Sequence, residues 1–201
     1  MNLILALLAA YLLGAIPFGF LLVKWKTGGD IRAAGSGNIG ATNVLRTNGL
    51  WAGVATLILD IGKGYLAVWL AERLNAGGVF AMSASALAVM AGHAYPAFLG
   101  FRGGKAVATF VGAFLCLSPL ATAGALVVFL AMTAWTRHVS AGSVLAAGTF
   151  PLAAWIVAHP PWPVLAASVV AGAFVVYRHR ENIERLHNGT ESALSFPPQG
   201  R

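Results

Sequence analysis

The sequence contains little charge and a single cysteine. Only 9% of its 201 residues are charged, whereas 58% are hydrophobic. A soluble domain of this length cannot leave several long apolar runs without a polar face, so the composition excludes an ordinary water-soluble protein. An internal disulfide is also excluded, because Cys116 has no second cysteine with which to pair. Cys116 lies in an apolar run, and its simplest interpretation is a small core residue.

Several local signals are missing as well. No basic residue precedes the first apolar run, Leu3 to Leu13, although a cleavable signal peptide needs one. We therefore expect this run to remain as the first membrane span. The sequence has no Gly-x-x-x-x-Gly-Lys-Ser/Thr loop for nucleotides. Its spacings reveal neither a Ser-His-Asp arrangement nor a cluster of metal ligands, so we expect no metal and no other cofactor.

Apolar segments recur along the whole chain, each long enough, or nearly so, to cross about 30 Å of hydrocarbon. Helices satisfy all of their backbone groups inside lipid. The sequence thus predicts an all-α polytopic membrane protein, with about seven spans in one domain of residues 1–201. The expected spans are 3–23, 51–71, 79–99, 106–117, 119–136, 141–158 and 162–177.

The basic residues select one orientation for these spans. The formal net charge is +7, and in a seven-span arrangement almost every Lys and Arg falls on one side. Only Arg73 lies in an opposite loop, and Lys63 lies within the second span. The positive-inside rule then places the N-terminus outside and the C-terminus in the cytoplasm. The alternative, which merges 106–136 into one crossing, would scatter the basic loops over both faces.

Four polar segments would share the cytoplasmic side of a bacterial inner membrane in this arrangement. They are residues 24–50, 99–106, 137–140 and 178–201. Topology accounts for the basic charge, so we do not expect nucleic-acid binding. We therefore expect the active site on the cytoplasmic side, among these four segments.

The first polar segment contains a glycine-rich loop that reads GSGNIGATN at 35–43. Glycines let a loop turn several N–H groups toward one anion, as phosphate sites require. A helix that began near Thr42 would add its N-terminal dipole. The plainer alternative is a tight turn with no ligand. The clustering of donors favours phosphate binding, and the candidate residues are Ser36, Gly37, Asn38, Gly40, Thr42, Asn43 and Arg46.

The second polar segment contains Gly103, Gly104 and Lys105. A glycine pair lets the backbone approach a ligand, and a lysine ammonium suits phosphate oxygens. Alternatively, Arg102 and Lys105 only anchor a span end at lipid headgroups.

Upstream, His93 has the simple interpretation of a packing histidine. Asp60 and Lys63 are spaced i, i+3 within the second span, which predicts a structural ion pair that could brace the site from behind.

The C-terminal segment contains His179, Asn182 and Glu191 among several basic residues. A helix here would place His179 and Asn182 on one stripe. Read alone, the segment also resembles an amphipathic basic tail that rests on anionic lipid. Both interpretations keep it at the membrane surface.

Together, these segments resemble the bacterial membrane glycerol-3-phosphate acyltransferases that use acyl phosphate as donor, the PlsY family. The similar stretches run in order from the first span to the tail. They are Ile16-Pro17-Phe18-Gly19, the 35–43 loop with Arg46, Asp60-Ile61-Gly62-Lys63-Gly64, Gly92-His93 through Lys105, Arg137-His138-Val139-Ser140, His179 to Ile183, and Gly189-Thr190-Glu191.

The resemblance implies transfer of a fatty acyl group from acyl phosphate to the sn-1 hydroxyl of glycerol 3-phosphate. The products would be lysophosphatidic acid and phosphate, at the start of phospholipid synthesis, with membrane lipid as the other partner. It implies catalytic roles for Ser36, Arg46, Lys105, His179 and Asn182. It implies substrate contacts from Gly37, Asn38, Gly40, Thr42, Asn43, Gly103, Gly104 and Ser140, and a structural role for Glu191.

Three positions depart from the family pattern: Arg102 stands where Lys is more usual, Ala106 where Gly is, and His138 where Tyr is. Ala106 puts the shape of the loop after Lys105 in question.

The expected mechanism is direct attack by the glycerol hydroxyl, whose proton goes to a substrate phosphate oxygen or to His179. The rival is a membrane transporter of an organic phosphate, with Asp60 and Lys63 on its path. The absence of a visible inverted repeat argues against it.

Overall fold

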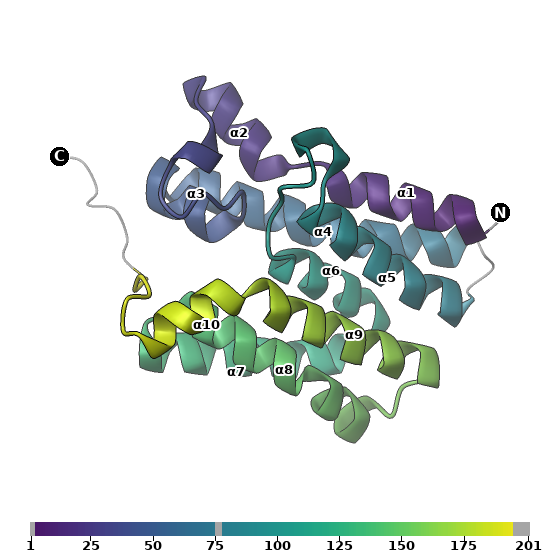
Figure 1. The fold of residues 1–201 in the computed structure, drawn as a ribbon. Helices are drawn as coiled ribbons and strands as arrows, with labels where there is room; N and C mark the ends of the chain where they lie inside the picture. Colours follow the sequence, from purple (N-terminus) through teal and green to yellow (C-terminus); the bar gives the residue numbers. More distant parts are fainter. Residues whose placement is uncertain (1–2, 75–77, 195–201) are drawn as a thin grey trace.

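The protein is entirely helical in the residues that the computed structural model describes, 3–74 and 78–194. Figure 1 shows the long helices side by side in a bundle, as the composition predicts. The helices are α1 (Leu3–Ala15), α2 (Phe18–Thr27), α3 (Ala41–Asn48), α4 (Leu50–Leu74), α5 (Val79–Ala94), α6 (Val107–Leu117), α7 (Pro119–Thr136), α8 (Val139–Ala158), α9 (Trp162–Arg178) and α10 (Arg180–His187). Two short 3-10 turns, η1 (Ile31–Ala33) and η2 (Ala97–Leu99), lie in the polar segments.

Four helical segments of the described chain are long and apolar enough to cross a membrane, and α9 with α10 adds a fifth if the bent pair is one span. The four are Leu3–Thr27, Leu50–Leu74, Pro119–Thr136 and Val139–Ala158. Large apolar side chains such as Val127 and Leu130 of α7 point outward, as lipid contact requires. A helix lies at each of the seven expected positions. The count of seven crossings stays a prediction.

Prolines correct two of the expected boundaries. Helix α5 ends at Ala94 instead of continuing to 99, because the residue before Pro96 disfavours helical geometry. The first expected span, 3–23, is interrupted between α1 and α2 at Pro17, which lacks an N–H for the helical ladder. Each break frees backbone carbonyls for contacts with other segments.

Two layers of apolar packing hold the bundle together. One joins α1, α4, α5 and α6, and the other joins α5 and α6 to α7, α8 and α9. In the second layer, the rings of Phe110, Phe114 and Phe150 pack against one another in tilted and edge-to-face contacts, with centroids 4.7–4.9 Å apart. Helices α4 and α6 touch through glycine: a Cβ on Gly112 would lie 1.9 Å from the carbonyl oxygen of Ile61. Small residues at such contacts allow close helix packing in membranes.

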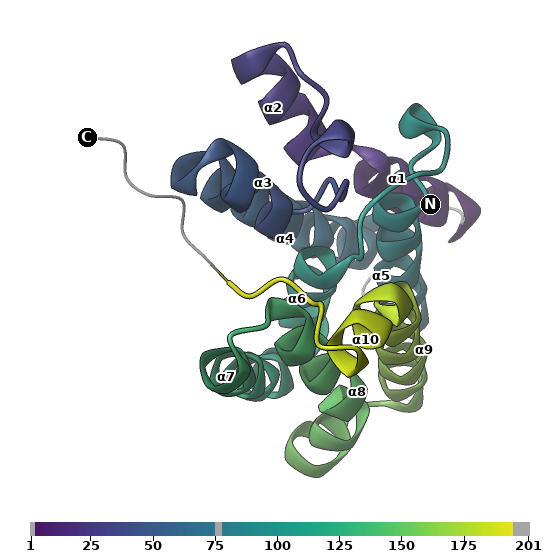
Figure 2. The same cartoon turned by 60° about the vertical axis from the view of Figure 1, so that its left-hand side comes forward.

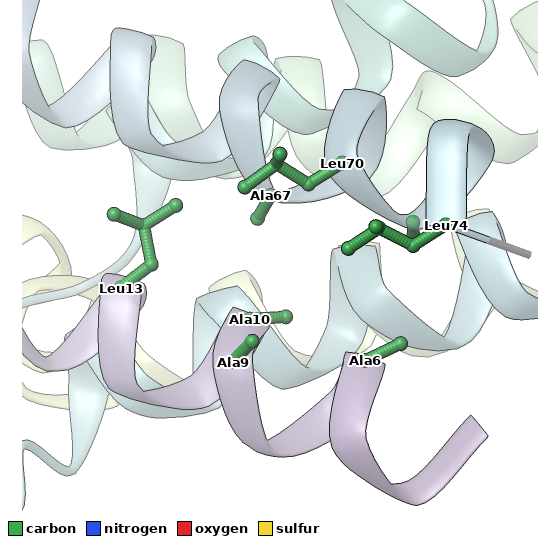
Figure 3. Close-up of a pocket in the computed structure, with 8 residues that line it drawn as sticks. Ala6, Ala9, Ala10, Leu13, Ala67, Leu70 and Leu74 are labelled. Atoms are coloured by element: carbon green, nitrogen blue, oxygen red, sulfur yellow. The ribbon is translucent and has the colours of Figure 1, made fainter. Parts of the chain in front are cut away.

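A small pocket between α1 and α4 carries no chemistry. Figure 3 shows alanines of α1 facing leucines of α4 across it. Its volume is about 10 Å³, and only alanine and leucine line it. The polar side chains gather elsewhere. In Figure 1, α3 and α10 lie at the end of the bundle opposite the N-terminus.

Candidate active site

The C-terminal segment contacts all three of the other polar segments. Helices α9 and α10 meet at an angle of 55°, with His179 at the bend. Beyond α10, residues 188–194 form what we call the C-terminal strap, which runs toward α3 in Figure 2. Arg46 donates to the carbonyl oxygens of Ser192 and Ala193 at 3.0 and 3.3 Å. Residues 195–201 of the expected segment lie outside the described residues.

Glu191 in this strap holds three side chains by hydrogen bonds. Its Oε1 accepts from Ser140 Oγ at 2.7 Å and from Asn182 Nδ2 at 2.6 Å. Its Oε2 accepts from Arg185 Nε at 2.8 Å. Burial alone would raise the pKa of Glu191, but these three hydrogen bonds outweigh it and keep the pKa below its ordinary value. Glu191 is thus an ionised acceptor that joins α8, α10 and the strap.

Lys105 enters the same cluster from the loop before α6. Its ammonium donates a hydrogen bond to Asn182 Oδ1. Burial lowers the pKa of Lys105 to about 8, although the charge of Glu191 acts in the opposite direction. The ammonium is still mostly protonated at pH 7. A partly desolvated cation whose hydrogen-bond partner is a neutral amide is well suited to bind a phosphate oxygen.

Arg178 fixes the two glycines that precede Lys105. Its guanidinium donates to the carbonyl oxygen of Gly104 at 3.0 and 3.2 Å and to that of Gly103 at 3.3 Å. It also lies over the ring of Tyr95, 5.0 Å from the centroid. The sequence showed Arg178 only as one basic residue of the tail. Its position at the end of α9, next to His179, was the available signal.

The glycines have a packing reason that the sequence did not reveal. A Cβ on Gly103 would lie 2.2 Å from the carbonyl oxygen of His93, and one on Gly104 would lie 2.1 Å from His93 Nε2. Their N–H groups donate to the carbonyl oxygens of Ala94 and His93. Just after Lys105, Ala106 has φ 61°, in the left-handed region. Alanine there costs about 1–2 kcal/mol relative to the ordinary right-handed region, so the loop keeps a shape that glycine would adopt freely.

His179 is buried at the bend with one ring nitrogen engaged. Its Nδ1 lies 2.8 Å from the carbonyl oxygen of Val175. A carbonyl only accepts, so Nδ1 carries the proton and Nε2 keeps its lone pair. Burial lowers the pKa of His179 to about 4, with a further contribution from the charge of Lys105. His179 is therefore neutral at pH 7 and presents an acceptor.

The glycine-rich loop folds around Asn43. Its Oδ1 accepts from the N–H of Ser36 at 2.9 Å, and its Nδ2 donates to the carbonyl oxygens of Ala34 and Asn38. Asn38 Oδ1 in turn accepts from the N–H of Gly40 at 2.8 Å. The expected substrate contact of the Asn43 amide stays a prediction, and the structure gives this buried amide a loop-shaping role.

Helix α3 begins at Ala41, with Gly40 as its cap, so a helix does begin close to Thr42, as the dipole argument requires. Within the described residues, the hydroxyls of Ser36 and Thr42 have no intramolecular hydrogen bond. Arg46 Nε is buried and likewise lacks a partner among the described residues. These three groups are donors that the fold does not use.

A buried ionic cluster lies behind the glycine pair. Lys63 Nζ is 2.8 Å from Asp60 Oδ1, which confirms the predicted i, i+3 pair. His93 Nδ1 lies 3.6 Å from the same oxygen. Lys63 also donates to the carbonyl oxygen of Ile16 at 2.8 Å, at the break between α1 and α2. Among the described residues, no three His, Cys, Asp or Glu side chains are arranged to hold a metal ion.

Comparison with known proteins yields one consistent family. Residues 4–189 match the family model described as glycerol-3-phosphate acyltransferase. The chain is 47% identical to the glycerol-3-phosphate acyltransferase of Geobacter sulfurreducens, over 91% of this chain and 93% of that protein. It is 49% identical to that of Trichlorobacter lovleyi, again over 91% and 93% of the two chains.

Solved structures agree. The crystal structure of PlsY, an integral membrane glycerol 3-phosphate acyltransferase, in its glycerol 3-phosphate form matches with a TM-score of 0.91. The sequence identity is 38%, and the match covers 97% of this chain and 96% of that one. The lysophosphatidic acid form of the same enzyme matches with a TM-score of 0.88 and 37% identity.

Proposed function

The chain belongs to the glycerol-3-phosphate acyltransferase family, and we propose that it takes its acyl group from acyl phosphate and delivers it to the sn-1 hydroxyl of glycerol 3-phosphate. As a member, it is an integral membrane enzyme of phospholipid synthesis that produces lysophosphatidic acid. The transporter alternative is thereby set aside. The proposal concerns the identity of the acyl donor, the residues of the active site and the orientation of the protein in the membrane.

One observation carries the proposed site: the C-terminal segment is hydrogen-bonded to Lys105 and Ser140 through its Asn182 and Glu191 side chains, and to Arg46 through backbone carbonyl oxygens of the strap. Both proposed substrates carry phosphate, so a site for the pair must offset their mutual repulsion. This arrangement supplies the Lys105 ammonium and the Arg46 guanidinium from different segments. The Ser36 hydroxyl on the neighbouring loop adds an unused donor.

We assign the phosphate of glycerol 3-phosphate to Lys105, with Asn182 and His179 completing the pocket. The N–H and carbonyl groups of Gly103 and Gly104 are already bonded within the protein, so these glycines contribute by placing Lys105. The loop candidates contribute to holding both phosphates, as does Ser140 from α8. They are Ser36, Gly37, Asn38, Gly40, Thr42, Asn43 and Arg46.

The reaction needs no covalent enzyme intermediate, because phosphate is already a good leaving group in an acyl phosphate. The sn-1 oxygen attacks the acyl carbon, and the carbon–oxygen bond to phosphate breaks. Positioning and charge stabilisation then supply most of the rate. With a pKa of about 4, His179 is a weak base, whereas a phosphate monoester has its second pKa at about 6. We therefore assign the proton of the hydroxyl to a substrate phosphate oxygen, with His179 Nε2 orienting that hydroxyl.

The helix directions support seven spans in one domain of residues 1–201. The start of α5 contacts the start of α9, where Phe80 and Trp162 lie 6.4 Å apart. The ends of the same helices meet where Tyr95 contacts Phe174 at 6.1 Å. Helices α5 and α9 are thus parallel, as three separate crossings by α6, α7 and α8 require. If α6 and α7 formed one crossing, α5 and α9 would be antiparallel instead. With the positive-inside rule, the site then faces the cytoplasm.

The test uses purified protein in detergent or lipid mesophase with acyl phosphate and glycerol 3-phosphate. We expect lysophosphatidic acid and phosphate in equal amounts, and little product with acyl-coenzyme A as the control donor. Formation of lysophosphatidic acid with acyl-coenzyme A but not with acyl phosphate would refute the proposal that acyl phosphate is the donor. In a His179→Ala arm, an obligatory protein base predicts a loss of at least about 10²-fold in turnover. We expect a smaller loss, because the phosphate takes the proton.

A further inference from the structure

The ionic cluster of Asp60, Lys63 and His93 is buried where four segments meet. The exposed fractions of Asp60, Lys63 and His93 are 2%, 3% and 4%. Asp60 and Lys63 belong to α4 and His93 to α5, and the cluster reaches the α1–α2 break through Ile16. Taking charges out of water costs several kcal/mol per ion even when they are paired. Apolar residues would hold these helices together at least as well, so stability alone does not explain the cluster.

The cluster contacts the loop that carries Lys105 through the side chain of His93. The His93 ring lies so close to Gly104 that a Cβ there would be 2.1 Å from Nε2. The carbonyl oxygen of His93 also accepts from the N–H of Gly104 at 3.1 Å. Arg178 donates to the carbonyl oxygens of the two glycines. The Gly104 backbone is therefore held at its N–H by His93 and at its carbonyl oxygen by Arg178.

Lys105 follows directly, and its ammonium has no anionic hydrogen-bond partner within the described residues that would hold it in place. Its one hydrogen bond goes to the neutral amide of Asn182. The location of its backbone therefore decides how far the ammonium reaches. Displacement of a binding group by about 1 Å is enough to cost up to about 10²-fold in rate.

We propose that His93, held in place by Asp60, is a positioning residue for the glycerol 3-phosphate site. The His93 ring packs against the Gly104 backbone and so determines where the Lys105 ammonium lies. This inference rests on the proposed assignment of Lys105 to the phosphate of glycerol 3-phosphate. His93 itself touches no substrate.

The first experiment compares His93→Ala with His93→Gln in purified enzyme. His93→Ala should raise KM for glycerol 3-phosphate about tenfold, while KM for acyl phosphate and kcat change less, because the lost interaction is ground-state binding of one substrate. His93→Gln fills most of the space and should restore KM to within about threefold of the wild type. A matched control is Ser85→Ala, a buried polar residue of α5 two turns away, which should leave both KM values unchanged.

A purely structural role predicts a different outcome. His93→Ala would then lower the thermal midpoint in detergent and leave KM for glycerol 3-phosphate unchanged, and this result would overturn the proposal. If His93→Ala fails to fold, the double variant Asp60→Leu/Lys63→Met replaces the ion pair by apolar groups of similar volume and removes the oxygen that faces His93 Nδ1. The same rise in KM is expected from it, and an unchanged KM refutes the role of Asp60.

Lys105 separates failure of this inference from failure of the proposed site. If Lys105→Ala leaves KM for glycerol 3-phosphate unchanged, the proposed site is wrong. If it raises KM but His93→Ala does not, only the positioning role is wrong. In the double variant His93→Ala/Lys105→Ala, we expect no further weakening of glycerol 3-phosphate binding beyond Lys105→Ala alone, because His93 acts through Lys105.

Discussion

Lys105 illustrates how burial and charge combine at one residue. Burial disfavours the ammonium and brings the pKa down to about 8, while the nearby Glu191 carboxylate favours the charged form. The result is a cation at pH 7 that a modest rise in pH neutralises. Asn182, as a neutral partner, holds the ammonium without cancelling its charge.

The pH dependence of kcat/KM for glycerol 3-phosphate should report this titration. Lys105 is protonated below its pKa, so kcat/KM should be highest near pH 7, should fall to about half by pH 8 and should then approach a tenfold loss per pH unit. Lys105→Arg keeps its charge throughout this range and should give a lower but level profile. A wild-type profile that stays level up to pH 9.5 would show that the charge of Lys105 is not needed.

The C-terminal strap is the element that assembles the site. Glu191 ties it to α8 through Ser140 and to α10 through Asn182 and Arg185. Leu194 extends the attachment by donating its N–H to the carbonyl oxygen of Arg137. The structural role expected of Glu191 from the sequence stays a prediction, and these hydrogen bonds give it a physical basis.

Replacing Glu191 tests that role. Glu191→Ala leaves the buried donors of Ser140 and Asn182 without their acceptor, at a cost of about 1–3 kcal/mol for each group left unsatisfied. We expect a lower thermal midpoint and a reduced kcat/KM, because Asn182 loses its orientation toward Lys105. Glu191→Gln retains an acceptor oxygen and should fall between Glu191→Ala and wild type. Glu184→Ala, at an exposed position of α10, is the control. Equal midpoints for Glu191→Ala and Glu184→Ala would contradict the prediction.

On the scale of the whole molecule, the polar segments converge at one end of the helical bundle. Within the described residues, segments 24–50, 99–106 and 137–140 each contact the C-terminal segment directly. Aromatic residues with high exposure flank this end and the other: Trp25 is 87% exposed and Trp162 71%. Such residues are typical of the boundary between lipid and water.

Labelling of single cysteines tests the proposed orientation. In a Cys116→Ser background, Trp25→Cys should react with a membrane-impermeant maleimide only from the cytoplasmic side, and Trp162→Cys only from the outside. The expectation follows from seven crossings and the positive-inside rule. Reaction of both cysteines from the same side would refute the seven-span arrangement, and reversed sides would refute the orientation.

The fold class, the helix positions and the candidate motifs can all be read from the amino-acid sequence. Apolar runs and their polar connections predict them directly, because lipid requires every spanning backbone to be helical. The i, i+3 spacing also predicted the pairing of Asp60 with Lys63, since that contact is local. Prolines limited the accuracy of boundaries: the break at Pro17 and the end of α5 before Pro96 were missed.

Which residues contact one another across the chain depends on how the helices pack. Arg46 and Ser192 are 146 positions apart, and nothing local in the sequence specifies their contact. The same holds for two contacts of Gly104: the His93 ring packs against it, and Arg178 donates a hydrogen bond to its carbonyl oxygen. Both contacts depend on the packing of α5 beside α9. Local periodicity encodes each helix, whereas the site depends on long-range packing and burial, which also set the pKa values of Lys105 and His179.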